Sequence, residues 1–325
     1  MNKLGNRQDT VELLKHYSAF ILLVVMLLIN LIITPNFFRM STLFNIITQT
    51  CTIILTGMGM TAVISTGGID ISVGSVMALG GVVTAVLLNK IGIVPSMIIA
   101  LLVCMISGAI AGFMIGTLRV QAMVVTLALM MGVRGAAQLV NDGKIYYIND
   151  TNDISAALQA AFKSIGTGRI GGIMPVQVFP IVISVALTWF LLEKTILGRH
   201  IQAVGDNPRS ATLAGISTSK TLLFVYMFSA FCAGFAGIIT AAKTGAADAN
   251  TLGNLAELDA IAAVAVGGTS MAGGRAKVFG TVIGAMIMQL INISVNMNNI
   301  TYEYAQILKA IIIVLAVYIQ REKNS

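Results

Sequence analysis

The strongest constraint on this chain is a succession of long apolar segments that recurs along the whole sequence. Most of them approach the ~20 residues that an α-helix needs to cross the hydrocarbon core of a bilayer. Hydropathy predicts ten spans, at residues 17–34, 44–66, 73–89, 92–118, 121–141, 176–193, 220–241, 258–269, 278–297 and 304–320. The eighth is short enough to be a half-helix that does not cross fully. The sequence therefore predicts an all-α, polytopic membrane bundle, with residues 1–325 forming a single transmembrane domain.

Composition excludes other classes of protein. Hydrophobic residues make up 57% of the chain and charged residues 10%, whereas a soluble domain carries roughly 25% charged residues. That balance excludes a soluble enzyme, a disordered chain and a disulfide scaffold. The first apolar run follows Lys3, Arg7 and Lys15 as in a signal peptide, but it ends without a small-x-small cleavage site. It is therefore predicted to be an uncleaved first span.

The placement of Lys and Arg predicts the orientation of the spans. With the N-terminus inside, the cytoplasmic segments hold 12 of the 20 basic residues and the outer segments hold six. Three of those six belong to the long outer loop at residues 142–175, and long loops count little in the positive-inside rule. Both termini are thus predicted to be cytoplasmic, with a second large loop at 194–220 on the same side. Topology explains the net charge of +7, so a nucleic-acid partner is not indicated.

The sequence offers no residues for a metal site or for ATP hydrolysis. Cys51, Cys104 and Cys232 lie in apolar runs without CxxC spacing, which is typical of small buried side chains. The two histidines, His16 and His200, are not at a metal-ligand spacing. No Gly-x-x-x-x-Gly-Lys-Ser/Thr phosphate loop occurs, so any energy from ATP must come from a partner. We expect neither a metal nor a cofactor on this chain.

Glycines at four-residue spacing predict close helix packing. Gly108, Gly112 and Gly116 form one such series, and Gly280 with Gly284 forms another. Small residues on one helix face let two backbones approach in lipid, where packing rather than hydrophobicity drives association.

Polar side chains within the apolar segments are candidates for a solute pathway. Gln289, Asn292 and Asn296 share one face of the ninth span, and Gln49 and Thr52 form a weaker cluster in the second. Such groups line an aqueous path or hydrogen-bond a neighbouring helix, and the sequence does not separate the two readings. The lone bases Arg134 and Lys309 favour structural pairing over a proton relay.

Two glycine-rich segments interrupt the apolar runs in a related way. Gly67 and Gly68 precede Asp70, and Gly267 and Gly268 precede Ser270. Glycine permits a sharp turn, and Asp or Ser can bond free amides at a helix start. Tight turns on the cytoplasmic side are favoured over substrate binding.

The inner loop at 194–220 contains its own helix signal. Asn207 with Pro208 predicts a helix start, and residues 209–214 can form a short helix that Gly215 ends. An exposed helix of this kind is suited to docking in a groove of a cytoplasmic partner.

These pieces together resemble the permease subunits of bacterial sugar ATP-binding-cassette importers of the ribose, galactose and xylose group. The segments that carry the resemblance lie at 67–75, 119–122 with 126–127, 197–199, 203–207, 214–216, 257–263, 267–270 and 273–274. Residues 245–250 look most like the galactofuranose and galactose branches. The resemblance covers nearly the whole chain in the expected order.

The resemblance implies a transport subunit in a bacterial cytoplasmic membrane. It implies a second permease copy or paralogue, an extracytoplasmic sugar-binding protein, and a tandem-domain ATPase that binds ATP and magnesium. It also implies that the inner loop is the coupling element that meets the ATPase. The residues concerned are Arg199, Gly205, Asn207, Arg209, Ala214 and Gly215. Glu257 and Asp259, near the outer end of the eighth span, would cap that half-helix or help to dock the binding protein, and capping is preferred.

Two alternatives remain open from the residues alone. An ion-coupled secondary transporter should embed a carboxylate in mid-membrane, and Asp70, the one candidate near a span, sits at a predicted turn. A membrane enzyme would need a nucleophile motif or a metal cluster, and the sequence contains neither.

Overall fold

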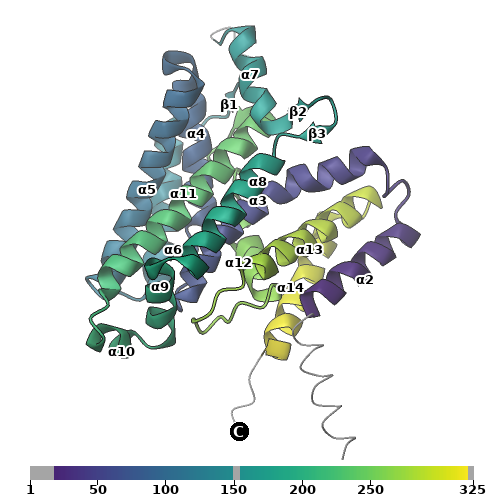
Figure 1. The fold of residues 1–325 in the computed structure, drawn as a ribbon. Helices are drawn as coiled ribbons and strands as arrows, with labels where there is room; N and C mark the ends of the chain where they lie inside the picture. The colour runs from purple at the N-terminus through teal and green to yellow at the C-terminus, as the bar shows by residue number, and fades with distance from the viewer. Residues whose placement is uncertain (1–17, 149–153, 321–325) are drawn as a thin grey trace, which may run out of the picture.

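The computed structural model describes residues 18–148 and 154–320 and shows a helical bundle (Figure 1). The helices of its apolar segments are α2 (Ser18–Ile33), α3 (Met40–Ser65), α4 (Val73–Ile91), α5 (Ile93–Gly116), α6 (Ala122–Leu139), α8 (Val178–Trp189), α11 (Thr218–Thr244), α12 (Ala256–Val266), α13 (Val278–Met297) and α14 (Tyr302–Gln320). Each predicted apolar segment overlaps with one of these helices, so the all-α class is confirmed.

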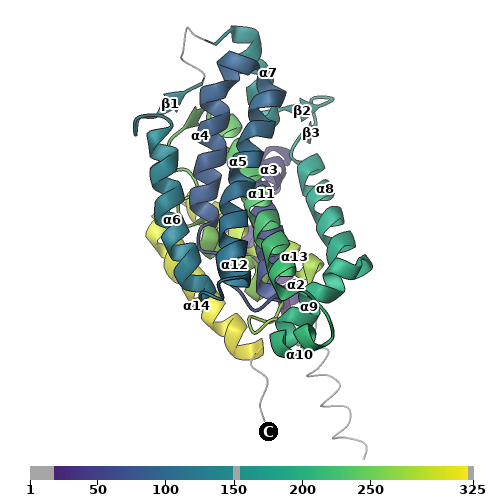
Figure 2. The ribbon, with the colours of Figure 1, turned by 90° about the vertical axis from the view of Figure 1, so that its left-hand side faces the viewer.

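Shorter elements cover the two ends of the bundle. They are β1 (Tyr146–Tyr147), α7 (Ala156–Thr167), β2 (Arg169–Ile170), β3 (Met174–Pro175), η1 (Phe190–Lys194), α9 (Ile196–Asp206), α10 (Pro208–Leu213) and β4 (Ala246–Ala247). β1 pairs with β4 and β2 with β3, both antiparallel. The strands and α7 lie at one end, while α9, α10, the start of α2 and the end of α14 lie at the other (Figures 1 and 2).

Not every apolar helix is long enough to cross a bilayer. Among the described residues, 6 helices have the length and composition of membrane spans, or up to 7 if the pair Val178–Lys194 and Ile196–Asp206, bent by 72°, counts as one. The chain is thus a multi-pass membrane protein, whereas ten crossings stay a prediction. The terminal basic residues used for orientation, Lys3, Arg7, Lys15, Arg321 and Lys323, lie outside the described residues.

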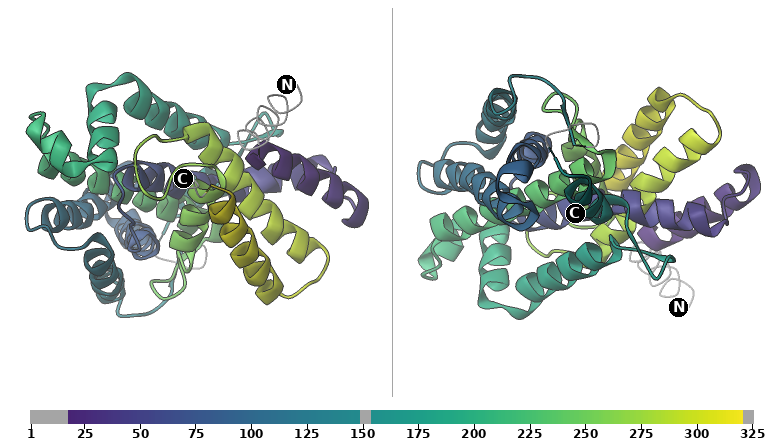
Figure 3. Two further views of the ribbon diagram at one scale, coloured as in Figure 1. Left: turned by 90° about the horizontal axis from the view of Figure 1, so that it is seen from below. Right: turned by 90° about the horizontal axis from the view of Figure 1, so that it is seen from above.

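Helices α3 and α11 form the centre of the bundle. Figures 1 and 3 show α2, α13 and α14 on one side and α4, α5 and α6 on the other. α11 packs against α3, α4 and α5, and α3 also packs against α12 and α13. Large apolar side chains on the outer helices remain exposed, including Ile32 (84%), Leu139 (83%) and Val314 (68%). An exposed apolar surface of this extent suits contact with lipid.

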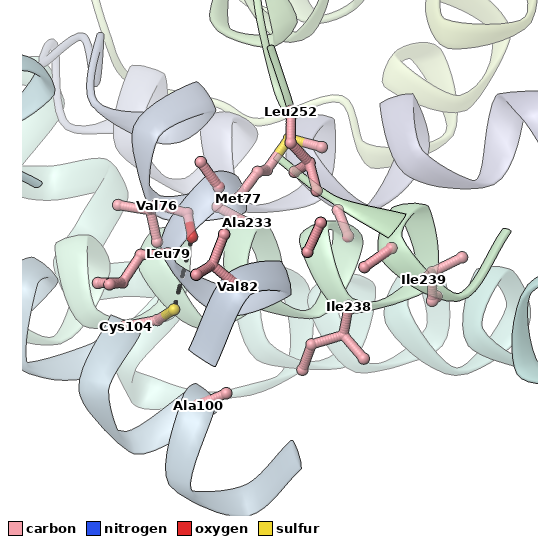
Figure 4. Close-up of a cluster of buried hydrophobic side chains, with 14 of the residues drawn as sticks. Val76, Met77, Leu79, Val82, Ala100, Cys104, Ala233, Ile238, Ile239 and Leu252 are labelled. Carbon is pink, nitrogen blue, oxygen red and sulfur yellow. Dashed lines mark hydrogen bonds between the residues drawn. The ribbon is translucent and has the colours of Figure 1, made fainter. Parts of the chain in front are cut away.

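The core between α4, α5 and α11 is built from small and medium side chains (Figure 4). Val76 and Val82 of α4 lie beside Cys104 of α5 and Ala233 of α11, and the Cys104 thiol donates to the Val76 carbonyl at 3.5 Å. Cys51, Cys104 and Cys232 are free and buried, which confirms the sequence reading.

The glycine series pack as predicted. A Cβ atom at Gly112 would lie 2.5 Å from Leu223 Cα, and one at Gly116 would lie 3.0 Å from Ser219 Cα, both on α11. Gly280 meets the backbone of Gly267, and Gly284 meets that of Ala263 on α12. These contacts bring α5 against α11 and α13 against α12 at backbone distance, which larger residues would prevent.

Gly112→Ala is expected to destabilise the fold by about 1–3 kcal/mol, because the added methyl must displace backbone. Gly132→Ala is the matched control, since no atom lies within 4 Å of a Cβ atom there. On an open helix face the alanine should be neutral or stabilising by up to about 1 kcal/mol. Thermal unfolding of the purified chain in detergent measures both variants. Equal stability of the two would contradict the packing assignment.

Candidate functional site

The two glycine-rich breaks lie against each other and against α9. The chain leaves α3 after Ser65, where Gly67 adopts φ +76°, and leaves α12 after Val266, where Gly268 adopts φ +89°. The Gly274 amide donates to the Ser65 carbonyl at 3.0 Å. Gly205 of α9 packs on both segments that make this contact. A Cβ atom there would meet the Ser65 carbonyl and lie 2.6 Å from the Gly274 nitrogen. The breaks and the inner loop thus form one cluster.

The capping side chains of the two breaks differ in their surroundings. Ser270 is exposed, and its Oγ accepts from the Ala272 amide at 3.2 Å. Asp70 is 3% exposed and accepts from the Ser72 amide at 3.0 Å, from Ser72 Oγ at 2.6 Å and from Ser229 Oγ at 2.8 Å. Ser229 lies eleven residues into α11, or about 17 Å along its axis. Asp70 therefore lies inside the bundle rather than on a surface turn.

The starts of α4 and α12 meet in the same interior region. The backbones of Gly74 and Gly253 are in contact, and a Cβ atom at Gly74 would lie 2.6 Å from Glu257 Oε2. Two helix N-termini that face each other favour carboxylates nearby, since each carries a partial positive charge. Asp70, Glu257 and Asp259 supply them, and Glu257 and Asp259 occupy the first turn of α12.

Two basic side chains from outer helices hold this region. Lys309 of α14 pairs with Asp259 at 2.6 Å, with side-chain exposures of 8% and 20%. Arg134 of α6 donates from Nη1 to the carbonyls of Ala249 and Leu252, each at 2.8 Å. Structural roles are thus favoured for both bases, although Arg134 meets carbonyls rather than an acid. Arg134 thus holds the segment that leads into α12, and Lys309 holds the first turn of α12.

The loop between β4 and α12 has an acid of its own. Burial raises the pKa of Asp248, but hydrogen bonds from Thr251 Oγ1 and from the Asn250 amide and side chain outweigh it and hold the pKa below its usual value. Gln138 of α6 donates to Asn250 Oδ1 at 2.7 Å. α6 therefore contacts this loop along its length, at Arg134 and at Gln138.

The polar stripe of α13 divides into groups with different contacts. Gln289 donates to Gln49 Oε1 of α3 at 2.8 Å, and Thr52 Oγ1 donates to the Gln49 carbonyl at 3.2 Å. Asn292 is partly buried, and its Oδ1 is buried with no hydrogen-bond partner. Asn296 is exposed. Gln289 and Gln49 thus bridge two helices, while Asn292 retains a free acceptor.

A further polar ladder joins α13 to α2, and sequence reasoning missed it. Ser294 Oγ donates to Asn30 Oδ1 at 2.6 Å, Asn298 Nδ2 donates to Thr34 Oγ1 at 2.9 Å, and Thr34 donates to Asn30 at 2.9 Å. Asn30 and Thr34 are four residues apart in the first apolar segment. That i, i+4 spacing was the available signal.

The inner loop contains two helices. Thr195 Oγ1 caps α9 by accepting from the Gly198 amide at 3.1 Å, and Asn207 Oδ1 caps α10 by accepting from the Arg209 and Ser210 amides at 3.0 and 3.1 Å. The predicted short helix is confirmed, with Ala214 at its C-cap and Gly215 next at φ +82°. α9 was not predicted. Arg199 and Arg209 are exposed, whereas Gly205 is packed in the cluster described above.

The described residues offer no metal centre. Across residues 18–148 and 154–320, no group of three or more His, Cys, Asp or Glu side chains is placed to hold a metal ion. Three charged side chains of this region have other partners: Lys309 pairs with Asp259, Arg134 donates to backbone carbonyls, and Asp70 accepts from Ser72 and Ser229.

Comparison with known proteins places the chain in a family. The family model described as "Branched-chain amino acid transport system / permease component" matches residues 42–317. The chain is 37% identical to the ribose import permease protein RbsC of Escherichia coli (strain K12), covering 98% of each chain. It is 35% identical to the galactofuranose transporter permease protein YtfT of the same strain, covering 93% of this chain and 88% of YtfT.

A third relative is the galactose/methyl galactoside import permease protein MglC of Salmonella typhimurium, at 33% identity over 96% of each chain. No solved structure matches the chain. Because the family model covers most of the sequence and these relatives align over nearly their full length, the chain belongs to this family of transport-system permease components.

Proposed function

We propose that the chain is the permease subunit of an ATP-binding-cassette importer that moves a monosaccharide across the bacterial cytoplasmic membrane. The observation that carries this proposal is the nearly full-length similarity to permeases named for ribose, galactofuranose and galactose import. Membership of a family of permease components argues for a subunit that needs partners, and does not support a self-contained ion-coupled carrier. It equally argues against an enzyme.

The proposed partners follow from what the chain lacks and from its family. A tandem-domain ATPase supplies the ATP- and magnesium-binding sites, because this sequence contains no phosphate loop. A second permease copy or paralogue completes the path, and an extracytoplasmic binding protein delivers the sugar. The bilayer covers the exposed apolar faces of the outer helices.

The proposed topology has ten crossings with both termini inside. The start of α2 and the end of α14 lie at the end of the bundle that carries α9 and α10, in agreement with an even number of crossings (Figure 1). The positive-inside bias makes this the cytoplasmic end.

In this topology α9 and α10 form the coupling element. α10 projects from the bundle with Leu213 90% exposed, while Gly205 at the base of the element packs on both glycine-rich breaks. Movement of α10 by a docked ATPase would therefore act directly on the ends of α3 and α12. Alternating access then opens the path to one side of the membrane at a time.

Leu213→Glu should uncouple the complex without unfolding the permease. The side chain is almost fully exposed, so the fold loses little, but a charge is placed where an apolar contact with the ATPase is expected. We expect loss of ATPase copurification and of sugar-stimulated ATP hydrolysis. Ile173→Glu, an exposed site (67%) in the hairpin at the opposite end, is the control for copurification. Normal coupling in Leu213→Glu would reject the assignment of α10.

Reconstitution with a sugar panel tests the function itself. The permease is placed in liposomes with its ATPase and binding protein, and ATP hydrolysis is measured with ribose, galactose, xylose and, as a contrasting solute, leucine. Stimulation by one sugar supports the proposal. Stimulation by leucine alone would overturn it, as would uptake that survives ATP depletion and collapses with an ion gradient.

A further inference from the structure

A cavity of about 820 Å³ lies beside α9 and α10, and nothing described above uses it. Three parts of the chain line it: the break after α3 at residues 66–68, the connection between α5 and α6, and the segment from α9 to the lower half of α11. Its size falls within the ~300–1,000 Å³ of small-molecule sites. The cavity thus joins the coupling element to the first glycine-rich break.

The charged side chains that line the cavity are all basic. Arg119 and Arg209 both line it, and none of the described lining residues is Asp or Glu. Arg119 adopts φ +57°, an uncommon conformation for a residue other than glycine. Guanidinium groups present planar, forked donors that match the oxygens of a phosphate group.

The N-terminus of α11 adds positive potential to the same cavity. Ser217, Thr218 and Ser219 line it, and Ser217 makes no side-chain cap bond at the start of this 27-residue helix. Free amides and the helix dipole at such an end favour an anion.

A buried hydroxyl also lacks a partner on the cavity wall. Tyr226 is 0% exposed, and its Oη has no hydrogen-bond partner. Both Tyr226 and Gly68 line the cavity, and a Cβ atom at Gly68 would lie 2.6 Å from the Tyr226 Oη. Buried polar atoms are normally satisfied by protein, water or ligand. This hydroxyl is therefore available as a donor to a bound group.

We propose that this cavity binds a phosphate-type oxyanion, held by Arg119, Arg209, the N-terminus of α11 and the Tyr226 hydroxyl. The source is either a free phosphorylated small molecule or the headgroup of an anionic phospholipid, which share this chemistry. The assignment of the cavity to the cytoplasmic side rests on the proposed function, whereas the binding itself does not. A bound oxyanion bridges residues 208–219 and the break at 66–68, and so ties the coupling element to the bundle.

The first test measures binding by the purified chain in neutral detergent. Inorganic phosphate is titrated against chloride at matched ionic strength while the thermal unfolding midpoint is followed, since a ligand of the folded state raises it saturably. We expect Arg119→Gln with Arg209→Gln to weaken phosphate binding by at least about 100-fold, and Tyr226→Phe to weaken it by about tenfold. Lys220→Gln, an exposed base at the same end that does not line the cavity, should change nothing.

The second test separates the two sources. The chain is placed in nanodiscs of neutral lipid, and either glycerol 3-phosphate or phosphatidylglycerol is added. Stabilisation by the soluble compound identifies a free phosphate ligand, and stabilisation by the lipid alone identifies a headgroup. Absence of saturable stabilisation in both arms would overturn the proposal, and so would equal weakening in Lys220→Gln. Neither result depends on transport, so failure here leaves the sugar proposal standing.

Discussion

Lys309→Met is expected to lower the free energy of unfolding by about 3–5 kcal/mol, one of the two largest effects anticipated for this chain. The substitution leaves the Asp259 carboxylate in the interior without the cation that lies 2.6 Å away. Both side chains are largely shielded from solvent, at 8% and 20% exposure, so water cannot replace the lost partner cheaply. The loss should also free the start of α12, where Asp259 lies in the first turn.

The double variant Lys309→Met with Asp259→Asn is the decisive comparison. Removing both charges leaves no buried ion, so most of the stability should return, although each single variant is costly. Lys163→Met controls for charge loss as such, because Lys163 is an exposed residue of α7. The measurement is the unfolding midpoint, in detergent, of the unchanged chain, Lys309→Met, the double variant and Lys163→Met. A double variant as unstable as the Lys309→Met single would show that the pair does not carry the effect.

Apolar length was enough to predict where the helices lie, because a segment that must shield its backbone from lipid has few options other than a helix. The prediction at 258–269 and the helix α12 at Ala256–Val266 differ only at their ends. The helix ends at Gly267 and Gly268, where Gly268 adopts φ +89°, and the Gly267 backbone meets that of Gly280 across the helix pair. That contact could not be found from local sequence.

α9 was missed for a different reason. Its sequence mixes Gly198, Arg199, His200 and Gln202 with isolated apolar residues, so no long apolar run marks it. The structure buries Ile201 and Val204 on one face, the pattern of an amphipathic helix at the end of the bundle. A search for helical periodicity, in place of mean hydropathy, would have detected it.

The contacts between distant residues were beyond a single sequence. Structural pairing was expected for Lys309, yet its partner Asp259 is fifty residues away in the sequence. Gly205 and Ser65 were both in segments singled out from the sequence, but nothing in their spacing indicated that they touch. The sequence identified the participating segments, and the packing of the helices decided which of them meet.

Asn292→Leu with Asn296→Leu is expected to lower sugar uptake by about 10–100-fold while leaving the complex assembled. Asn292 carries the one polar atom of the predicted stripe that is buried without a partner, and Asn296 is exposed one turn further on. A sugar hydroxyl that bonds such a group during passage would lose about 1–3 kcal/mol when the group is removed and the hydroxyl is left without a partner. Stability should be unchanged or improved, because an unsatisfied buried oxygen disappears.

Two further variants distinguish a pathway from simple helix packing. Gln289→Leu with Gln49→Leu removes both partners of the hydrogen bond between α3 and α13. Comparing it with the Asn292 and Asn296 variant separates the loss of this bond from the loss of a free acceptor. Asn298→Leu breaks the bond to Thr34, the residue that follows α2, and should cost about 1 kcal/mol of stability without changing uptake per folded transporter. Uptake is measured in proteoliposomes and normalised to assembled complex. Unaltered uptake in the Asn292 and Asn296 variant would reject the stripe as a pathway element, because these side chains would then have only a structural role.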